Sequence, residues 1–235
     1  MTQTARSKRT SSGQRREESL SRERIIEASI ELLDRSGDGD LTFRALSERL
    51  ATGPGAIYWH IASKSDLLTA ACDAIIARTM NAPLASTTPS ATPQAAIRLL
   101  ALAIFDAIDA HPWLGSALAH APVQLPMIRI VERLGQQIRA LGVPGEEHWI
   151  TASALLNYIL GVGGRNAANG QFARTQGLDR SDFLEAVSTV WSQLDPEEYP
   201  FARSLAAQLR AHDDRIDFLA GIDLILRGID SPQCR

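Results

Sequence analysis

Apolar residues recur at every third or fourth position along most of the chain between residues 21 and 229. This spacing places them on one side of an α-helix, which completes a turn in about 3.6 residues. The sequence contains no run of alternating β-branched residues between hairpin signals, the pattern that would indicate strands. The pattern therefore predicts an all-α fold.

The first four predicted helices are short and closely spaced. We expect helices at 21–35, at 42–50, at 54–60 and from residue 63 onwards. Thr42 and Ser63 stand where side chains cap the first N–H groups of a helix, and residues 51–55, ATGPG, must form a turn. A capped helix, a glycine-containing turn and a short helix in this order are typical of a helix-turn-helix DNA-binding domain.

The rest of the chain predicts a second helical domain. Residues 81–93, NAPLASTTPSATP, carry no charge and little apolar bulk, and therefore predict a loop or linker. The periodicity after it predicts helices at 97–108, 113–121, 127–141, 146–161, 179–194, 200–211 and 213–228. The expected organisation is a basic disordered arm at 1–20, a helix-turn-helix domain at 21–80, the linker at 81–93 and a C-terminal domain at 94–235.

Composition narrows the class of protein. Of the 235 residues 45% are apolar and 22% are charged, which is typical of a soluble globular protein. No apolar stretch approaches the roughly 20 residues that cross a bilayer, and the first residues lack the hydrophobic segment of a signal peptide, so we expect a cytoplasmic protein without a membrane partner. The two cysteines, Cys72 and Cys234, are expected to be free thiols, with Cys72 in the core.

Charge is distributed unevenly along the chain. The net charge is −3, yet residues 1–16 contain five basic residues and no acidic one. Such an arm predicts a local contact with phosphate groups, although a solvated tail would have the same composition. The short helix at 54–60 ends in Tyr58, Trp59 and His60, three large side chains with polar tips. Lys64 lies in the next helix's first turn, where the dipole disfavours a positive charge that a bound phosphate would offset.

These residues carry a resemblance to a known family. LTFRALSERL at 41–50, followed by ATGPGAIYWHIASKSDLL at 51–68, resembles the DNA-binding domain of the tetracycline-repressor (TetR) family. The shared pattern is Tyr-aromatic-His-hydrophobic, then two residues and Lys, then an acid and Leu-Leu. The segment DFLAGIDLILRGID at 217–230 is similar to the last helix of regulators with a tetracycline-repressor type of C-terminal domain.

The resemblance implies a homodimeric transcriptional regulator that binds a palindromic double-stranded DNA operator. It also implies that the last long helices of two subunits form a four-helix bundle, and that the space among the preceding helices holds an inducer. The DNA contacts implied by position are Thr42, Arg44, Pro54, Gly55, Ala56, Tyr58, Trp59, His60 and Lys64.

The implied roles differ along this set. Thr42 and Arg44 would contact phosphates or the groove, Tyr58, His60 and Lys64 would contact phosphates, and Trp59 would pack or contact the backbone. The segment 54–56 would face the bases, but its side chains offer no hydrogen bond. In this it differs from drug-responsive relatives. Apolar contacts and DNA shape are therefore the expected sources of sequence specificity. Purely structural roles stay open: core aromatics for Tyr58 and Trp59, a solvated arginine at Arg44 and a helix C-cap for His60.

The C-terminal domain has residues suited to a ligand cavity, because such cavities combine bulky apolar walls with a few polar groups. The candidate ligand-binding residues are Phe105, Trp113, His120, Trp149, Asn157, Tyr158 and Arg165, each of which could equally be ordinary core or surface. No position matches the family's tetracycline chelation motif, so tetracycline is not expected. A dimer is expected through 146–163 and 213–228, where small residues permit close helix approach: Ala152, Ala154, Gly161, Gly163 and Gly164.

No enzyme activity, metal or cofactor is expected. The five histidines lack metal-ligand spacing. GVGGR at 161–165 superficially resembles a phosphate-binding loop but follows a helix and lacks the Gly-Lys-Ser/Thr ending. The sequence thus predicts a repressor released from DNA by a small, largely apolar effector. The alternatives are an activator, or a ligand-independent or partner-controlled regulator whose C-terminal domain only dimerises.

Overall fold

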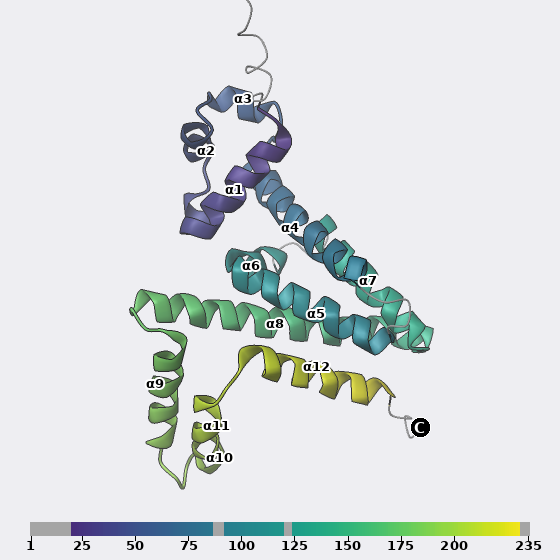
Figure 1. Cartoon of the computed structure of the whole chain (residues 1–235), viewed down its shortest axis with the longest axis vertical. Coiled ribbons are helices and arrows are strands. Elements are labelled where there is room, and N and C mark those ends of the chain that lie inside the picture. The colour runs from purple at the N-terminus through teal and green to yellow at the C-terminus, as the bar shows by residue number, and fades with distance from the viewer. Residues whose placement is uncertain (1–19, 87–91, 120–123, 231–235) are drawn as a thin grey trace, which may run out of the picture. The chain divides into compact units, whose positions relative to one another are not determined.

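The computed structural model describes residues 20–86, 92–119 and 124–230, and the chain divides into two compact units, Met1–Ala71 and Cys72–Arg235. All regular elements in the described ranges are helical, which confirms the all-α prediction (Figure 1). The first unit, called unit 1 below, contains α1 (Arg22–Ser36), the 3-10 turn η2 (Asp38–Asp40), α2 (Phe43–Arg49), α3 (Pro54–Tyr58) and the start of α4 (Lys64–Ser86).

Unit 1 is a small bundle in which α2 packs against both α1 and α3. Its core is formed by fully buried side chains from each of these helices, among them Ile25, Leu33, Leu46 and Ile57. The predicted start of α1 is confirmed, because the Ser21 hydroxyl accepts a hydrogen bond from the backbone N–H of Arg24 at 3.2 Å. The helix stops at Gly37, whose φ of 74° favours glycine.

Two predicted boundaries near this bundle are wrong. The third helix ends at Tyr58, and Trp59 and His60 form a turn instead of its last residues. The helix that begins at Lys64 continues to Ser86, so residues 81–86 are helical where a linker was predicted. Ala82, Leu84 and Ala85 have high helix propensity, which composition alone did not reveal. The chain divides within this helix, at residue 71, and residues 87–91 lie outside the described ranges.

Unit 2 is centred on the longest helix, α8. Besides the rest of α4, the unit contains α5 (Pro93–Ala110), α6 (Trp113–Ala119), α7 (Leu125–Ala140), the turn η3 (Gly145–Glu147), α8 (His148–Thr175), α9 (Arg180–Ser192), α10 (Pro200–Ser204), α11 (Ala206–Arg210) and α12 (Asp214–Asp230). Helices α5, α6, α7 and α12 all pack against α8, and α5, α8 and α12 lie side by side (Figure 1). A separate group is formed by α9, α10 and α11.

The predicted end of the eighth helix at Gly161 is wrong, because α8 continues through the glycines to Thr175. A Cβ on Gly163 would lie 3.1 Å from the Cδ1 atom of Ile108, and a Cβ on Gly115 would lie 3.4 Å from the Cα atom of Gly164. These glycines therefore allow α5 and α6 to approach α8 closely. The gain in packing offsets the cost of glycine in a helix interior. The GVGGR segment is accordingly a helix and not a loop.

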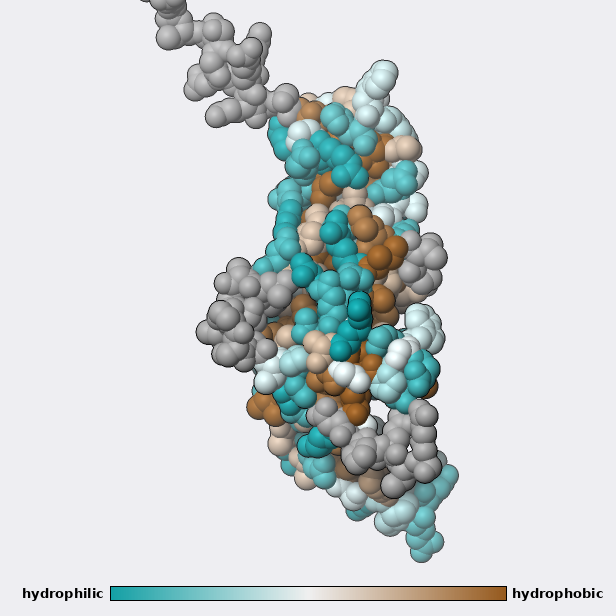
Figure 2. All heavy atoms as spheres, turned by 90° about the vertical axis from the view of Figure 1, so that its right-hand side faces the viewer, coloured by the Kyte–Doolittle hydropathy of each residue, from teal (hydrophilic) through white to brown (hydrophobic). Residues whose placement is uncertain are grey.

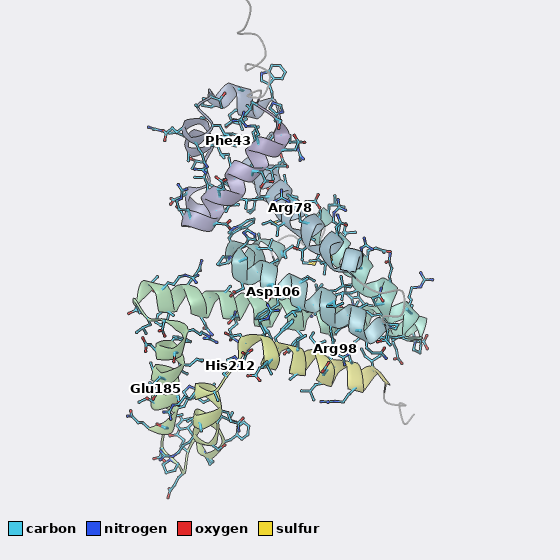
Figure 3. The ribbon with its side chains drawn as sticks, viewed as in Figure 1. Phe43, Arg78, Arg98, Asp106, Glu185 and His212 are labelled. Atoms are coloured by element: carbon cyan, nitrogen blue, oxygen red, sulfur yellow. The ribbon has the colours of Figure 1, made fainter. Side chains whose placement is uncertain are left out.

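Ion pairs join distant helices of unit 2. Arg98 Nε of α5 lies 2.5 Å from Asp223 Oδ1 of α12, and Arg129 Nε of α7 lies 2.7 Å from Asp73 Oδ1 of α4. His212 lies in the connection between α11 and α12, where its Nε2 is 3.0 Å from Asp214 Oδ1 (Figure 3). These contacts fix how the helices of this unit meet.

The core prediction for Cys72 is confirmed. Its side chain in α4 is only 3% exposed, and burial raises the pKa of the thiol to about 12. Cys234 lies outside the described ranges. On the face shown in Figure 2, patches of hydrophobic residues lie between hydrophilic ones. Within the ranges that the structure describes, no helix has the length and apolar character needed to span a membrane.

Candidate nucleic-acid interface and ligand cavity

The start of α2 presents two of the predicted DNA contacts to solvent. The Thr42 hydroxyl accepts a hydrogen bond from the Ala45 N–H at 3.1 Å, which confirms the predicted cap. Arg44 follows in the first turns, and its Nε donates to Glu48 Oε1 at 3.0 Å. Both side chains of this pair are mostly exposed, so the ion pair contributes little to stability. The Arg44 guanidinium can therefore exchange this carboxylate for another anion at low cost.

Helix α3 is short and is held by one buried residue. Gly53 precedes the helix, Pro54 occupies its first turn, and Ile57 is fully buried. Pro54 and Gly55 are exposed and Ala56 is half-buried. A Cβ on Gly55 would meet no atom within 4 Å. The outer side of α3 is thus small and apolar, and another molecule can approach its backbone closely.

Tyr58, Trp59 and His60 follow directly and are all exposed. Tyr58 is 53% exposed, and its ring stacks on the ring of Phe43 in α2, with centroids 4.2 Å apart and an angle of 10° between the planes. Trp59 is 90% exposed, so the alternative that it is a core aromatic is wrong. One face of the Tyr58 ring therefore packs on Phe43 while the remainder stays open to solvent, and its contact with phosphate stays a prediction.

The start of α4 carries the last predicted contact. The Ser63 hydroxyl accepts a hydrogen bond from the Asp66 N–H at 3.1 Å and donates one to Asp66 Oδ2 at 2.8 Å. This cap fixes the first turn of the helix, in which Lys64 is exposed. Of the nine predicted DNA contacts, eight are exposed and Ala56 is half-buried, and all belong to unit 1. The sequence prediction therefore selected an accessible set of residues.

Unit 2 contains a large cavity between α6, α7 and α8, with a volume of about 960 Å³. Three of the predicted ligand-binding residues line it: Trp149, Asn157 and Arg165. Its wall on α6 and α7 is apolar and includes Leu118 and Ile128. A space of this size and character is typical of small-molecule sites.

The other predicted ligand residues lie elsewhere. Phe105 and Tyr158 line a second cavity of about 530 Å³, bounded by α5, α8, α9, α11 and α12, and Arg165 borders both spaces. Trp113 is only 5% exposed and lines neither cavity, so it is a core residue. His120 lies outside the described ranges. The structure therefore divides the predicted set between two cavities.

Several residues of the large cavity were missed by sequence analysis. Gly161, Gly164 and Ala168 line it from α8, and Met127 and Val131 line it from α7. The available signal was the spacing of three and four residues along α8, which the predicted helix end at Gly161 cut short. Tyr158 is tied to α12 instead, because its hydroxyl donates to the Phe218 carbonyl at 3.1 Å, and burial raises its pKa.

The residues proposed for close helix approach in a dimer do not form one set. Gly163 is buried against Ile108 of the same chain, so its assignment to a free face is wrong. Ala154 is exposed and lies outside the large cavity, whereas Ala152, Gly161 and Gly164 line it. In the described part of the chain, no group of three or more His, Cys, Asp or Glu side chains is arranged to hold a metal ion.

Two family models match the chain. The model for bacterial regulatory proteins of the tetR family matches residues 25–71, and the model for the tetracyclin repressor-like C-terminal domain matches residues 87–232, which is more than half of the chain. The chain belongs to the TetR family. It is therefore a transcriptional regulator with a helix-turn-helix domain and a helical C-terminal domain.

Individual relatives agree with this assignment. The TetR-family regulator SCO7222 from Streptomyces coelicolor is 51% identical, with a TM-score of 0.79 over 90% of this chain and 98% of that one. BioQ, solved with its natural double-stranded DNA operator, is 27% identical, with a TM-score of 0.56 over 83% of this chain and 100% of that one. An HTH-type transcriptional regulator from Saccharopolyspora erythraea is 29% identical over 145 residues, which are 60% of this chain and 59% of that relative.

Proposed function

We propose that this TetR-family regulator is a homodimeric repressor that binds a palindromic operator through unit 1 and is released by a small, largely apolar ligand. The observation that carries the proposal is the exposed run Tyr58-Trp59-His60 directly after α3. An indole that is 90% exposed on a monomer is accounted for when another macromolecule covers it.

The contact chemistry supports DNA as that macromolecule. The Tyr58 ring is held by its stack on Phe43, so its hydroxyl is fixed for a hydrogen bond to phosphate without much loss of side-chain entropy. Arg44 and Lys64 add positive charge, and the N-terminus of α4 offers backbone N–H groups to an anion. The apolar segment 54–56 suits thymine methyl groups and groove shape. BioQ, at 27% identity, was solved with operator DNA.

The surface of α8 and α12 supports a dimer. Ile150 on α8 and Ile216 and Leu224 on α12 are large, apolar and exposed. Ala154 lies exposed on α8 and leaves space for a second helix. A two-fold dimer would present two copies of α3, which must be about 34–36 Å apart to enter successive major grooves.

The large cavity favours a ligand-controlled regulator over a domain that only dimerises. This space of about 960 Å³ is half open to solvent and has the size and mostly apolar lining of small-molecule sites. The two DNA-binding units of a dimer bind the operator at one spacing only. A ligand that binds better to a dimer with a different spacing would shift the equilibrium away from the operator-bound dimer. A thermal-shift screen against apolar metabolites and drugs tests this step, because specific binding raises the melting temperature.

The DNA contacts are tested by footprinting on DNA flanking the protein's own gene and by titration of the bound fragment. Tyr58→Ala and Lys64→Ala are each expected to weaken binding at least tenfold on every sequence, and Lys64→Ala to reduce the salt slope by about one. Tyr199→Ala and Arg139→Ala change exposed residues of unit 2 and serve as controls with unchanged affinity. Unaltered binding by both unit 1 variants would contradict the assigned contacts.

The dimer is tested separately by light scattering at micromolar concentration. The wild type is expected to be dimeric, and Leu224→Glu, which places a charge on the exposed face of α12, is expected to be monomeric with unchanged helix content. Arg227→Glu, on the same helix, is a control for the added negative charge. A monomeric wild type would defeat this part of the proposal.

A further inference from the structure

The large cavity of unit 2 has an unusual charge distribution. Among the described residues that line it, Arg165 is the only charged one, and the remaining polar groups are neutral: Ser116, Ser153, Asn157 and Gln171. No carboxylate from residues 20–86, 92–119 or 124–230 borders this space. The cavity therefore combines an apolar wall with a single positive charge.

Arg165 is exposed and differs from four arginines of unit 2 that pair across helices. Arg98, Arg129, Arg180 and Arg215 each form an ion pair with an aspartate of another helix. Within the part of the chain that the structure describes, Arg165 forms no ion pair. Its guanidinium is thus available to a molecule that enters the cavity.

The second cavity does not supply the missing partner. Asp214 and Asp217 line that space together with Arg165, but they are already paired: Asp214 with Arg180 and His212, and Asp217 with His212. Neither aspartate lines the large cavity. Toward that space, the residues that the structure describes therefore offer Arg165 no carboxylate.

The polar groups of α8 are arranged in a line. Ser153, Asn157, Gly161 and Arg165 follow one another at intervals of four residues and all line the large cavity, so they share one face of the helix. At 1.5 Å per residue, Ser153 and Arg165 are about 18 Å apart along the helix axis. The opposite wall is formed by apolar residues such as Leu118, Ile128 and Val131. The space is suited to an elongated molecule.

The energetics favour an acidic group at the Arg165 end. A neutral ligand that filled the cavity would remove water from the guanidinium without giving it a partner, which costs free energy. A carboxylate, sulfonate or phenolate would form charge-assisted hydrogen bonds with the guanidinium, and these are strongest where water is excluded. A cation would be repelled.

We infer that the large cavity binds an elongated apolar anion whose acidic group pairs with Arg165. The inference rests on the proposed function only in taking this cavity as the effector site. It assigns Arg165 as the residue that selects the charge of the ligand, and Ser153 and Asn157 as neutral hydrogen-bonding positions along its length.

Two fluorescent probes with the same aromatic skeleton test the charge selection. One is 1-anilinonaphthalene-8-sulfonate, an anion, and the other is N-phenyl-1-naphthylamine, which lacks the sulfonate. We expect Arg165→Met to weaken binding of the anion by roughly 10- to 100-fold while changing the affinity of the neutral probe less than about twofold. Arg165→Lys retains the charge and is expected to recover part of the affinity.

Two further variants locate the effect. Arg174→Met removes a positive charge from the same helix but away from the large cavity, and should leave both affinities unchanged. Ala168→Trp places a large ring beside Arg165 in the cavity wall, and should abolish binding of both probes at one site per chain. Circular dichroism of each variant checks that the helices are retained.

The inference is overturned if Arg165→Met lowers the affinity for both probes equally or for neither, or if Arg174→Met lowers the affinity for the anion as Arg165→Met does. It is also overturned if Ala168→Trp leaves anion binding intact, or if the wild type binds neither probe. Operator titration separates this inference from the proposed function. Charge-selective binding that never affects DNA would contradict effector control alone. Release from DNA by neutral ligands, unchanged by Arg165→Met, would contradict the inference alone.

Discussion

The helix caps at the candidate DNA-binding surface of unit 1 join residues close in sequence, whereas unit 2 depends on contacts between distant helices. The caps at Thr42 and Ser63 each use a backbone N–H three residues later. In unit 2, the Tyr158 hydroxyl bonds to a residue 60 positions away, and Arg98 pairs with a residue 125 positions away. The same difference applies to the sites, because one is a short run of residues and the other is assembled from three helices.

This contrast has a functional consequence. The proposed DNA contacts at 42–64 depend on helix caps formed within that segment. A cavity built from α6, α7 and α8 changes whenever any of these helices is repacked. If the proposed function holds, ligand specificity can therefore vary while the proposed DNA contacts stay the same.

The largest expected effect comes from the packing of α5 on α8. Ile108 is fully buried and lies against Gly163 and Gly115. Ile108→Ala would leave a cavity at this close approach and is expected to lower the free energy of unfolding by about 2–5 kcal/mol, measured by urea denaturation. Leu99→Ala on the same helix removes an exposed side chain and should change it by less than about 0.5 kcal/mol. If Ile108→Ala leaves the free energy of unfolding nearly unchanged, packing between distant helices is not what stabilises unit 2.

The same contrast explains what could be predicted from the sequence. The starts of α1, α2 and α4 were predictable because Ser21, Thr42 and Ser63 are polar caps whose partners lie three residues away. The exposure of the predicted DNA contacts follows from local sequence, because all of them lie within residues 42–64, on or next to short helices with polar caps. The course of α8 through its glycines was not predictable, since glycine disfavours a helix interior and the contact of Gly163 with Ile108 joins residues far apart in the sequence. The residues of the large cavity were predicted only in part, because the predicted helix end at Gly161 left out the later residues of α8.

The next largest effect concerns the contact between α8 and α12. A methyl group on Gly221 would overlap the hydroxyl and ring of Tyr158, which stacks on Phe218. Gly221→Ala is expected to destabilise the protein by about 1–3 kcal/mol, because the ring must move and its hydrogen bond to Phe218 is lost. The melting temperature measures the change.

A second substitution identifies the cause. Adding Tyr158→Ala removes the overlap, so the double variant should lose less stability than the sum of the two single variants. Gly135→Ala in α7, where a Cβ would meet nothing within 4 Å, should be neutral or stabilising. If the losses of stability in the two single variants add up in the double variant, Gly221→Ala destabilises the protein for a reason other than overlap with Tyr158.

A smaller effect depends on pH. Burial raises the pKa of the Cys72 thiol from an ordinary value of 9.0 to about 12, so the folded protein keeps the proton after the unfolded chain has lost it. Stability due to this group is complete below pH 9 and declines as the pH rises toward 12. The stability of the wild type relative to Cys72→Ala should fall by about 1.3 kcal/mol between pH 8 and pH 10. Both proteins should carry Cys234→Ser. A constant difference would show that the core of unit 2 is open at Cys72.

The smallest effect compares two helix caps directly. Thr42 caps α2, a helix of seven residues with two buried side chains, and Thr92 caps α5, a helix of 18 residues with seven. Thr42→Ala is expected to cost about 1 kcal/mol, and Thr42→Ser to recover most of it by restoring the acceptor oxygen. Thr92→Ala removes the same kind of hydrogen bond, 3.2 Å long, but should cost less because buried side chains hold the first turns of α5. Urea denaturation of the three variants measures these differences. An equal or larger loss for Thr92→Ala would contradict the view that local interactions matter more in unit 1 than in unit 2.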